Sequence, residues 1–118
     1  MASASETISA SVLAWPGVEA GPHQFGAVEF TVGEREIGHL HGNSLLDVPF
    51  PRAVREELVA AGLAEPHHFL PESGWVSFRI RRTDDAVAAI ALLRRSYDLI
   101  TAQLERRAAQ SAAARQRA

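Results

Sequence analysis

A long apolar stripe in the last third of the chain does most to constrain the fold. Between Thr83 and Arg107 apolar residues recur every three or four positions, at Val87, Ile90, Leu93, Tyr97, Ile100 and Leu104. This spacing is that of one face of an α-helix. Thr83-Asp84-Asp85 supplies a hydroxyl cap and two acids where the positive end of the helix dipole favours them. A helix with one apolar face needs a surface to cover, so the sequence predicts a second layer.

Alternating apolar residues predict that this second layer is a β-sheet. The segments 25–32, 35–41 and 75–81 are short and rich in β-branched and aromatic residues. In the last of them, Val76, Phe78 and Ile80 alternate with Trp75, Ser77 and Arg79. Gly33-Glu34 separates the first two segments and predicts a tight turn, so these two segments form a hairpin.

Turn and cap residues place the other elements. Ser3 or Ser5 can cap a first helix, which Trp15-Pro16-Gly17 ends. Pro51 fits the first position of a second helix, which stops at Gly62. Gly21-Pro22 indicates another break.

The remaining segments complete a single α+β domain. Residues 44–50 are expected to form a loop with an apolar centre, and residues 67–70 a short strand that makes a second hairpin with 75–81. We expect one α+β domain over residues 1–107, with an antiparallel sheet from two hairpins, helices on one face and a long C-terminal helix. Residues 108–118 are rich in alanine and have no apolar pattern, so we expect a frayed helix end or a disordered tail there.

Composition narrows the classes of function. The 118 residues include no cysteine, which excludes disulfides, thiolate nucleophiles and cysteine-ligated zinc. The net charge of −2 speaks against a dedicated nucleic-acid or membrane-surface binder. Six arginines face twelve acids in residues 1–93, whereas six arginines face two acids in residues 94–118. Any contact with a polyanion is therefore expected from the C-terminal end. The absence of an apolar run or leader pattern predicts a cytoplasmic protein with no membrane partner, and the arginine and alanine bias suggests a GC-rich bacterial genome.

Four histidines fall in two short blocks. His39 and His41 are two residues apart, so in a strand their side chains lie on one face, roughly 7 Å apart. His67 and His68 return beside the sheet. Two or three imidazoles on one face can bind a divalent transition metal, and we expect the set His39, His41 and His67.

Further residues are candidates for binding a ligand at this place. Glu29 or Asp47 could supply an oxygen ligand, and Trp75 could line a pocket. The predicted binding residues are Glu29, His39, His41, His67, His68 and Trp75. Acid/base catalysis by His39 or His41 is an alternative to metal binding. The catalytic residues stay open, because the chain contains no companion nucleophile motif and no phosphate-binding or dinucleotide-binding motif.

The length of the hairpin turn decides where the histidines point. With a two-residue turn, Val28 faces His39, and both histidines of this strand lie on the core face. With a three-residue turn, Glu29 faces His39, and the histidines lie opposite the core residues Val28 and Phe30. The second arrangement makes a carboxylate–imidazole pair, which would raise the pKa of the imidazole.

Structural interpretations compete with the functional ones. A histidine on a strand is more often a hydrogen-bonded structural residue than a metal ligand, and a tryptophan at the start of a strand usually covers the edge of a core. The spacing from Gly33 to His41 also matches the opening of the cupin metal motif. No glutamate follows at the required distance, so we treat that match as coincidence.

Several blocks of the sequence resemble one protein family. The segments WPGVEAGPHQFGAVEF, GEREIGHLHG, DVPFPRAVREELVAAGLAEPHHFLPESGWVSFRI and LLRRSYDLI resemble a small bacterial family labelled luciferase family or luciferase-domain proteins, of undetermined function. The resemblance covers residues 12–101. The order of elements is also similar to that of the MmcQ/YjbR-like domains, which implies the same α+β architecture.

Two hypotheses follow for the function. In the first, the domain binds a small molecule or a divalent transition metal at a histidine-lined site; whether it is an enzyme stays open. In the second, it is a non-enzymatic module that holds a protein or nucleic acid through the sheet or the basic last helix, and the histidines are structural. A homodimer through the last helix is compatible with both.

Overall fold

The computed structural model describes residues 2–117, which form three α-helices and six strands. The elements, in chain order, are α1 (Ala4–Leu13), β1 (Val18–Pro22), β2 (Val28–Val32), β3 (Arg35–His41), β4 (Leu45–Pro49), α2 (Arg52–Ala60), β5 (Glu65–Pro66), β6 (Trp75–Arg79) and α3 (Ala86–Arg117). Short 3₁₀ turns at Gln24–Gly26 and Thr83–Asp85 precede β2 and α3.

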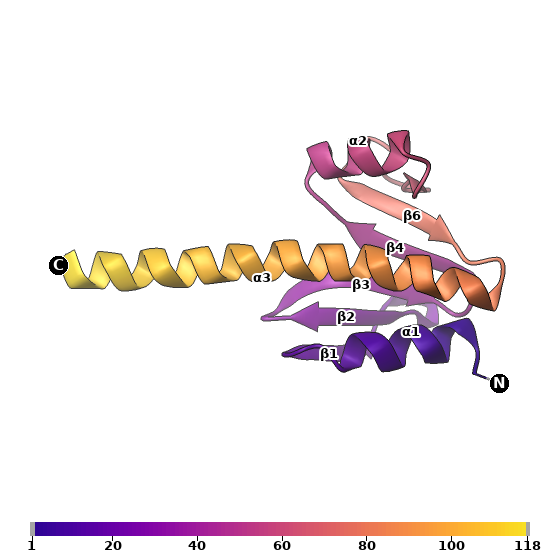
Figure 1. Ribbon diagram of the computed structural model, residues 1–118, viewed down its shortest axis with the longest axis horizontal. Helices are drawn as coiled ribbons and strands as arrows, with labels where there is room; N and C mark the ends of the chain where they lie inside the picture. Colours follow the sequence, from indigo (N-terminus) through magenta and orange to yellow (C-terminus); the bar gives the residue numbers. More distant parts are fainter. Residues whose placement is uncertain (1, 118) are drawn as a thin grey trace.

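The strands make one antiparallel sheet in the order β1-β2-β3-β4-β6-β5. The long α3 crosses one face of this sheet with α1 beside it, and its C-terminal half extends past the strands (Figure 1). An ion pair between Glu57 and Arg95 ties α2 to α3. The expected α+β architecture, with its antiparallel sheet and long C-terminal helix, is confirmed.

A closed apolar core lies between the helices and the sheet. The sheet contributes Phe30, Ile37, Leu40, Leu46, Val48 and Val76, and the helices contribute Ile8, Val12, Leu58, Ala89, Leu93 and Ile100. Ser3 caps α1 in a capping box with Glu6. Because the core occupies one face of the sheet, every second residue of the central strands is left for the other face.

The structure corrects the expected loop at 44–50. Its residues 45–49 form β4, which pairs with β3 on one side and β6 on the other. Asp47 and Pro49 are poor strand formers, which hides the strand in the sequence. The sheet tolerates Asp47 because its carboxylate is satisfied by neighbouring side chains.

Two further segments differ from the expectation. The break expected at Gly21-Pro22 lies within β1, an edge strand, where a missing amide hydrogen is tolerated. The strand expected at 67–70 is shifted to Glu65–Pro66, and residues 67–70 form a turn. The amides of Phe69 and Leu70 donate to Nδ1 of His67, which fixes that turn. The sheet is therefore a four-strand meander extended by β6 and β5, not two separate hairpins.

The β2–β3 register combines the two alternatives considered above. The turn has two residues, Gly33 and Glu34, with φ of 53° and 68°, as a type I′ turn requires. A β-bulge then inserts Ile37, so Thr31 faces Glu36 but Phe30 faces Gly38. The bulge moves the following residues by one position, so Glu29 faces His39. His39 therefore lies on the face that the helices leave uncovered.

The end of α3 extends beyond the packed part of the molecule. The structure continues this helix to Arg117, and residues 105–117 are exposed apart from the half-buried Ala113. Fraying of this end stays a prediction. Among residues 2–117, no helix is both long enough and apolar enough to cross a membrane.

Candidate metal centre

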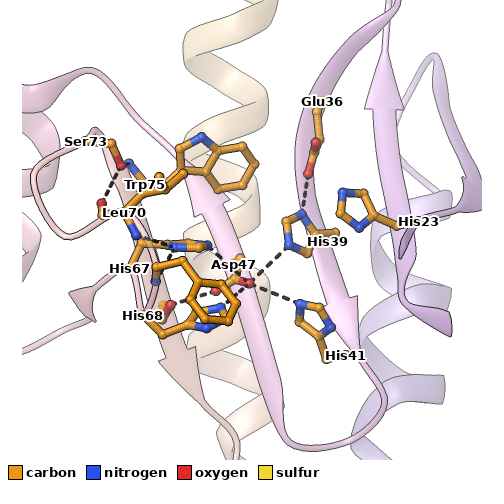
Figure 2. Close-up of polar contacts among 12 residues, drawn as sticks. His23, Glu36, His39, His41, Asp47, His67, His68, Leu70, Ser73 and Trp75 are labelled. Carbon is orange, nitrogen blue, oxygen red and sulfur yellow. Dashed lines mark hydrogen bonds and ion pairs between the residues drawn. The ribbon is translucent and has the colours of Figure 1, made fainter. Parts of the chain in front are cut away.

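All five histidines of the chain gather on the uncovered face of the sheet. His23 comes from the β1–β2 connection, His39 and His41 come from β3, and His67 and His68 come from the turn after β5. Figure 2 shows the β3 pair and the β5 pair pointing at Asp47 from opposite sides. Histidines from two separate segments of the chain therefore converge on one residue of β4, and His23 lies beside them.

The carboxylate of Asp47 is the centre of this cluster. Its side chain is fully buried, and its Oδ2 atom lies 3.1 Å from Nε2 of His39 and 3.1 Å from Nε2 of His41. Nε2 of His68 lies 3.2 Å and Nε2 of His67 lies 3.5 Å from the same oxygen. One buried oxygen is thus shared by four imidazole nitrogens.

The second oxygen of Asp47 is held by the neighbouring strand. Ser77, which is also buried, donates a hydrogen bond of 2.7 Å from its Oγ to Oδ1. This bond fixes the plane of the carboxylate and keeps Oδ2 directed at the histidines. Burial alone would raise the pKa of Asp47, but hydrogen bonds from His39, Ser77 and His68 outweigh that effect and hold this pKa well below its usual range.

His39 lies between two carboxylates. Its Nδ1 is 2.7 Å from Oε2 of Glu36, and its Nε2 faces Asp47. Burial disfavours the charged ring, yet the hydrogen bonds and negative charges of Asp47 and Glu36 raise the pKa of His39 to about 9. Below that pH the ring is an imidazolium that donates from both nitrogens.

His67 has a tautomer that the backbone fixes. Its Nδ1 accepts the backbone amides of Phe69 and Leu70, both at 3.1 Å, so the ring hydrogen is on Nε2. Burial lowers the pKa of His67. The negative charge of Asp47 raises this pKa, but the other histidines of the cluster lower it further, so the net shift is downward and favours the neutral ring. To bind a metal through Nε2, His67 would have to move this hydrogen to Nδ1 and lose both hydrogen bonds from the backbone. His67 is therefore a poorer ligand than its predicted place beside His39 and His41 suggests.

His23 stacks on His39 at the edge of the cluster. The two ring centroids are 4.0 Å apart and the planes are 14° from parallel. Nε2 of His23 is 3.9 Å from Oε1 of Glu29, and its buried Nδ1 has no hydrogen-bond partner among the described residues. Glu29 thus faces His39 in the register, but its carboxylate is directed toward His23.

The spacing of these ligand atoms matches that of a coordination sphere. Metal–nitrogen and metal–oxygen bonds of about 2.0–2.1 Å put neighbouring ligand atoms about 3.0–3.4 Å apart. The distances from Oδ2 of Asp47 to His39, His41 and His68 fall in this range. Three sets have all ligand atoms within 4.8 Å of one another: His23-Glu36-His39, His39-His41-Asp47 and Asp47-His67-His68. His39 and Asp47 link the three sets into one chain.

A cavity of about 340 Å³ opens beside the cluster. The histidines and Asp47 line one part of it, and Trp75 forms a wall. Phe25, Phe69 and Leu70 stand at its rim, with 95%, 79% and 50% of their surfaces exposed. Phe25 also has a φ of 60°, which is uncommon for a bulky residue. The cavity is therefore polar at its base and apolar at its entrance.

The structure brings together most of the predicted residues. His39, His41, His67, His68 and Trp75 all line the cavity, whereas Glu29 does not. Asp47 was predicted only as an alternative to Glu29 for an oxygen ligand, and its central place was not predicted. The supporting roles of Glu36, Ser77 and His23 were not predicted either. The available signal was an acid inside the apolar run Leu45–Val48, because a charge is rarely buried there without partners.

The fold and the site define a small α+β domain with a histidine–aspartate centre on the open face of its sheet. A model of the luciferase domain matches residues 34–96, so the chain belongs to the luciferase domain family. The matched segment contains every residue of the centre except His23. No curated protein and no solved structure matches the chain, and the likeness to MmcQ/YjbR-like domains is not shown.

Proposed function

We propose that this domain binds a divalent transition metal through His39, His41 and Asp47, and that the metal holds a small molecule in the adjoining cavity. The observation that supports this most is the convergence of imidazole nitrogens on one buried oxygen at 3.1–3.2 Å. A buried carboxylate can be satisfied by two or three hydrogen-bond donors of any kind, so a purely structural role for Asp47 does not need this many imidazoles around it. Two nitrogens and one carboxylate oxygen suit zinc, iron, manganese and nickel alike.

The surrounding residues have the roles expected of supporting groups at a metal site. Glu36 accepts the Nδ1 hydrogen of His39, which orients that ring and leaves Nε2 free to bind a metal once its proton is lost. Ser77 orients Asp47 in the same way. Binding would thus replace the proton on Nε2 of His39 by an ion.

His68 provides the next ligand position. Its Nε2 is 3.2 Å from Oδ2 of Asp47 but lies on the side of the second set, with His67. A single ion would draw His68 toward His39 and His41 as a fourth ligand. Two ions would share Asp47 as a bridge. The ratio of metal to protein distinguishes these two arrangements, and we expect one ion per chain.

The cavity supports a small-molecule ligand. Its volume lies at the lower end of the range of about 300–1,000 Å³ that is typical of such sites. A bound ion would polarise an oxygen of a ligand seated there. The apolar rim of Phe25, Phe69 and Leu70 favours a ligand with an apolar part outside. The name of the family is not itself evidence of light emission.

Metal analysis of untagged protein tests the metal-binding proposal directly. Protein purified without a polyhistidine tag should contain about one transition-metal ion per chain, and metal-free protein should gain thermal stability on addition of zinc, nickel or manganese. Asp47→Asn should abolish both effects. Asp98→Asn, at an exposed position on α3, is the matched control and should retain them. Absence of bound metal and of stabilisation by any of the ions would refute the proposal.

The exposed end of α3 supports the interaction module as a second candidate. Residues 105–117 carry four arginines and one glutamate and extend past the sheet (Figure 1). We infer that residues 1–107 are the folded unit and that the end of α3 contacts a partner. A chain ending at Arg107 should keep its melting temperature and its metal. If the full chain binds nucleic acid, its affinity should fall steeply with salt and be lost on truncation. If light scattering instead shows a dimer for the full chain and a monomer for the truncated chain, the end of α3 holds a homodimer together.

A further inference from the structure

A second cavity, of about 420 Å³, lies at the end of the sheet where β3 begins and β4 ends. One side is formed by α3, through Ser96, Leu99, Ile100 and Gln103. The other side is formed by Arg35 and Glu36 of β3, Pro49, Phe50 and Pro51 after β4, and Trp75 of β6. Glu36 and Trp75 also border the histidine cluster, and Figure 2 shows both side chains on that side.

Arg35 is a positive charge without an acidic partner at this cavity. Its guanidinium donates to Oε1 of Gln103 at 3.2 Å, which holds it against α3. The ion pairs formed within residues 2–117 do not include Arg35. Its neighbour Glu36 is paired with His39 of the same strand. A half-buried arginine in this position has donors left to bind an anion.

Apart from Arg35, Glu36, Ser96 and Gln103, the residues of the cavity wall are apolar. Phe50 and Ile100 are buried, while Trp75 and Leu99 are half-buried and contribute their side chains to the wall. Ser96 is already used, because its hydroxyl donates to the backbone oxygen of Ile37. Because the Glu36 carboxylate is paired with His39, Arg35 is left as the one unpaired charge of this wall, which suits a single negative charge on an apolar body. A phosphate ester carries more charge and generally needs more donors than Arg35 and Gln103 supply.

We propose that this second cavity binds a small organic monocarboxylate. The carboxylate pairs with Arg35, and the apolar body packs against Trp75, Leu99 and Ile100. A planar guanidinium forms two parallel hydrogen bonds with a carboxylate, which gives the site its preference for that group. The cavity has the volume of a small-molecule site and is distinct from the histidine-lined one. This binding does not depend on a metal.

Fluorescence of Trp75 provides the readout. The chain has two tryptophans, so Trp15→Phe leaves Trp75 as the single emitter. The protein is freed of metal with a chelator, which prevents a carboxylate from binding to an ion in the other cavity. The probes are benzoate, its neutral analogue benzamide and inorganic phosphate. Benzoate should change the Trp75 emission in a saturable way, and benzamide and phosphate should bind at least about tenfold more weakly.

Two variants separate loss of the charge from loss of the fold. Arg35→Gln should raise the dissociation constant of benzoate about tenfold or more, whereas Arg81→Gln, at an exposed position away from the cavity, should leave it unchanged. Gln103→Glu keeps Arg35 but gives it an internal carboxylate partner, so it should weaken benzoate binding to a similar degree. Equal binding of benzoate and benzamide, tighter binding of phosphate, or unchanged affinity in both cavity variants would overturn the proposal.

Discussion

Ser77 donates a 2.7 Å hydrogen bond to Oδ1 of Asp47 from the directly opposite position on the neighbouring strand. This bond uses one oxygen of a fully buried carboxylate and leaves the other to the histidines. The backbone pairing of β4 with β6 therefore sets the orientation of the proposed metal ligand. The site depends on the sheet itself and not on loops alone.

Ser77→Ala should weaken metal binding without abolishing it. Removal of a group that orients a ligand typically lowers metal affinity by about 10- to 100-fold. Competition with a chelating dye measures that affinity. Ser96→Ala is the matched control, since Ser96 is an equally buried serine whose hydroxyl bonds to the backbone of Ile37 outside the centre. It should lose stability but keep its metal affinity; equal effects of the two variants would argue against a role for Ser77 at the centre.

Glu36→Gln should affect His39 in two measurable ways. Without the negative charge at Nδ1, the pKa of His39 in metal-free protein should fall, because the Glu36 carboxylate is one of the two groups that raise it. Nitrogen-resolved NMR of the imidazole follows that pKa directly. The affinity for metal should also fall by about 10- to 100-fold.

The control for this variant is Glu34→Gln. Glu34 is exposed in the turn before β3 and makes no contact with the centre. It should leave both the His39 titration and the metal affinity unchanged. A His39 titration that is the same in Glu36→Gln and in the unaltered protein would show that the Glu36–His39 bond does not form in solution.

The stability of metal-free protein should fall as the pH rises from about 6.5 to above 9. The pKa of His39 is about 9 in the folded chain and near its ordinary value of 6.5 when unfolded. A raised pKa in the folded state stabilises the protein fully below the unfolded value, and this stabilisation is lost as the pH passes through the folded value. Asp47 has a lowered pKa and works in the opposite direction, losing its contribution only in acid.

Thermal unfolding in the presence of a chelator measures this dependence. The melting temperature should drop by several degrees between pH 6.5 and pH 9.5. In His39→Gln, which cannot titrate, the slope over this range should be much smaller. A slope that is unaffected by this substitution would assign the pH dependence to other groups.

Some of the site was predictable from the sequence, and the reasons for the rest are physical. The alternation around His39 and His41 is a local property of a strand, so their shared face followed directly. The bulge at Ile37 was not predictable, because it depends on how β3 packs under α3. β4 was hidden because Asp47 interrupts its apolar run, and a buried acid is acceptable only with partners from distant segments. Without β4 in the sheet, Asp47 was predicted only as an alternative to Glu29 for an oxygen ligand, and without β1 His23 had no predicted place in the centre.

Gly38 follows the bulge at Ile37 and packs closely against α3 and β4. A Cβ atom there would lie 2.7 Å from Cδ2 of Leu93 on α3 and 2.9 Å from the backbone oxygen of Asp47. Gly38→Ala should therefore destabilise the fold by about 1–3 kcal/mol, since a methyl group forced into a packed core displaces its neighbours. It should also weaken metal binding, because the displaced backbone belongs to His39 and Asp47. Denaturant unfolding measures the first effect, and chelator competition measures the second.

Gly21→Ala is the control that distinguishes this clash from the general effect of replacing glycine. Gly21 lies in the edge strand β1, and a Cβ there meets nothing within 4 Å. The same substitution at this position should raise the free energy of unfolding by about 0.4–1 kcal/mol, because it restricts only the unfolded chain. The two glycine variants are thus expected to have opposite signs. If Gly38→Ala were instead as stable as Gly21→Ala, Leu93 would not pack against Gly38 of β3, and the packing described beside the bulge at Ile37 would be wrong.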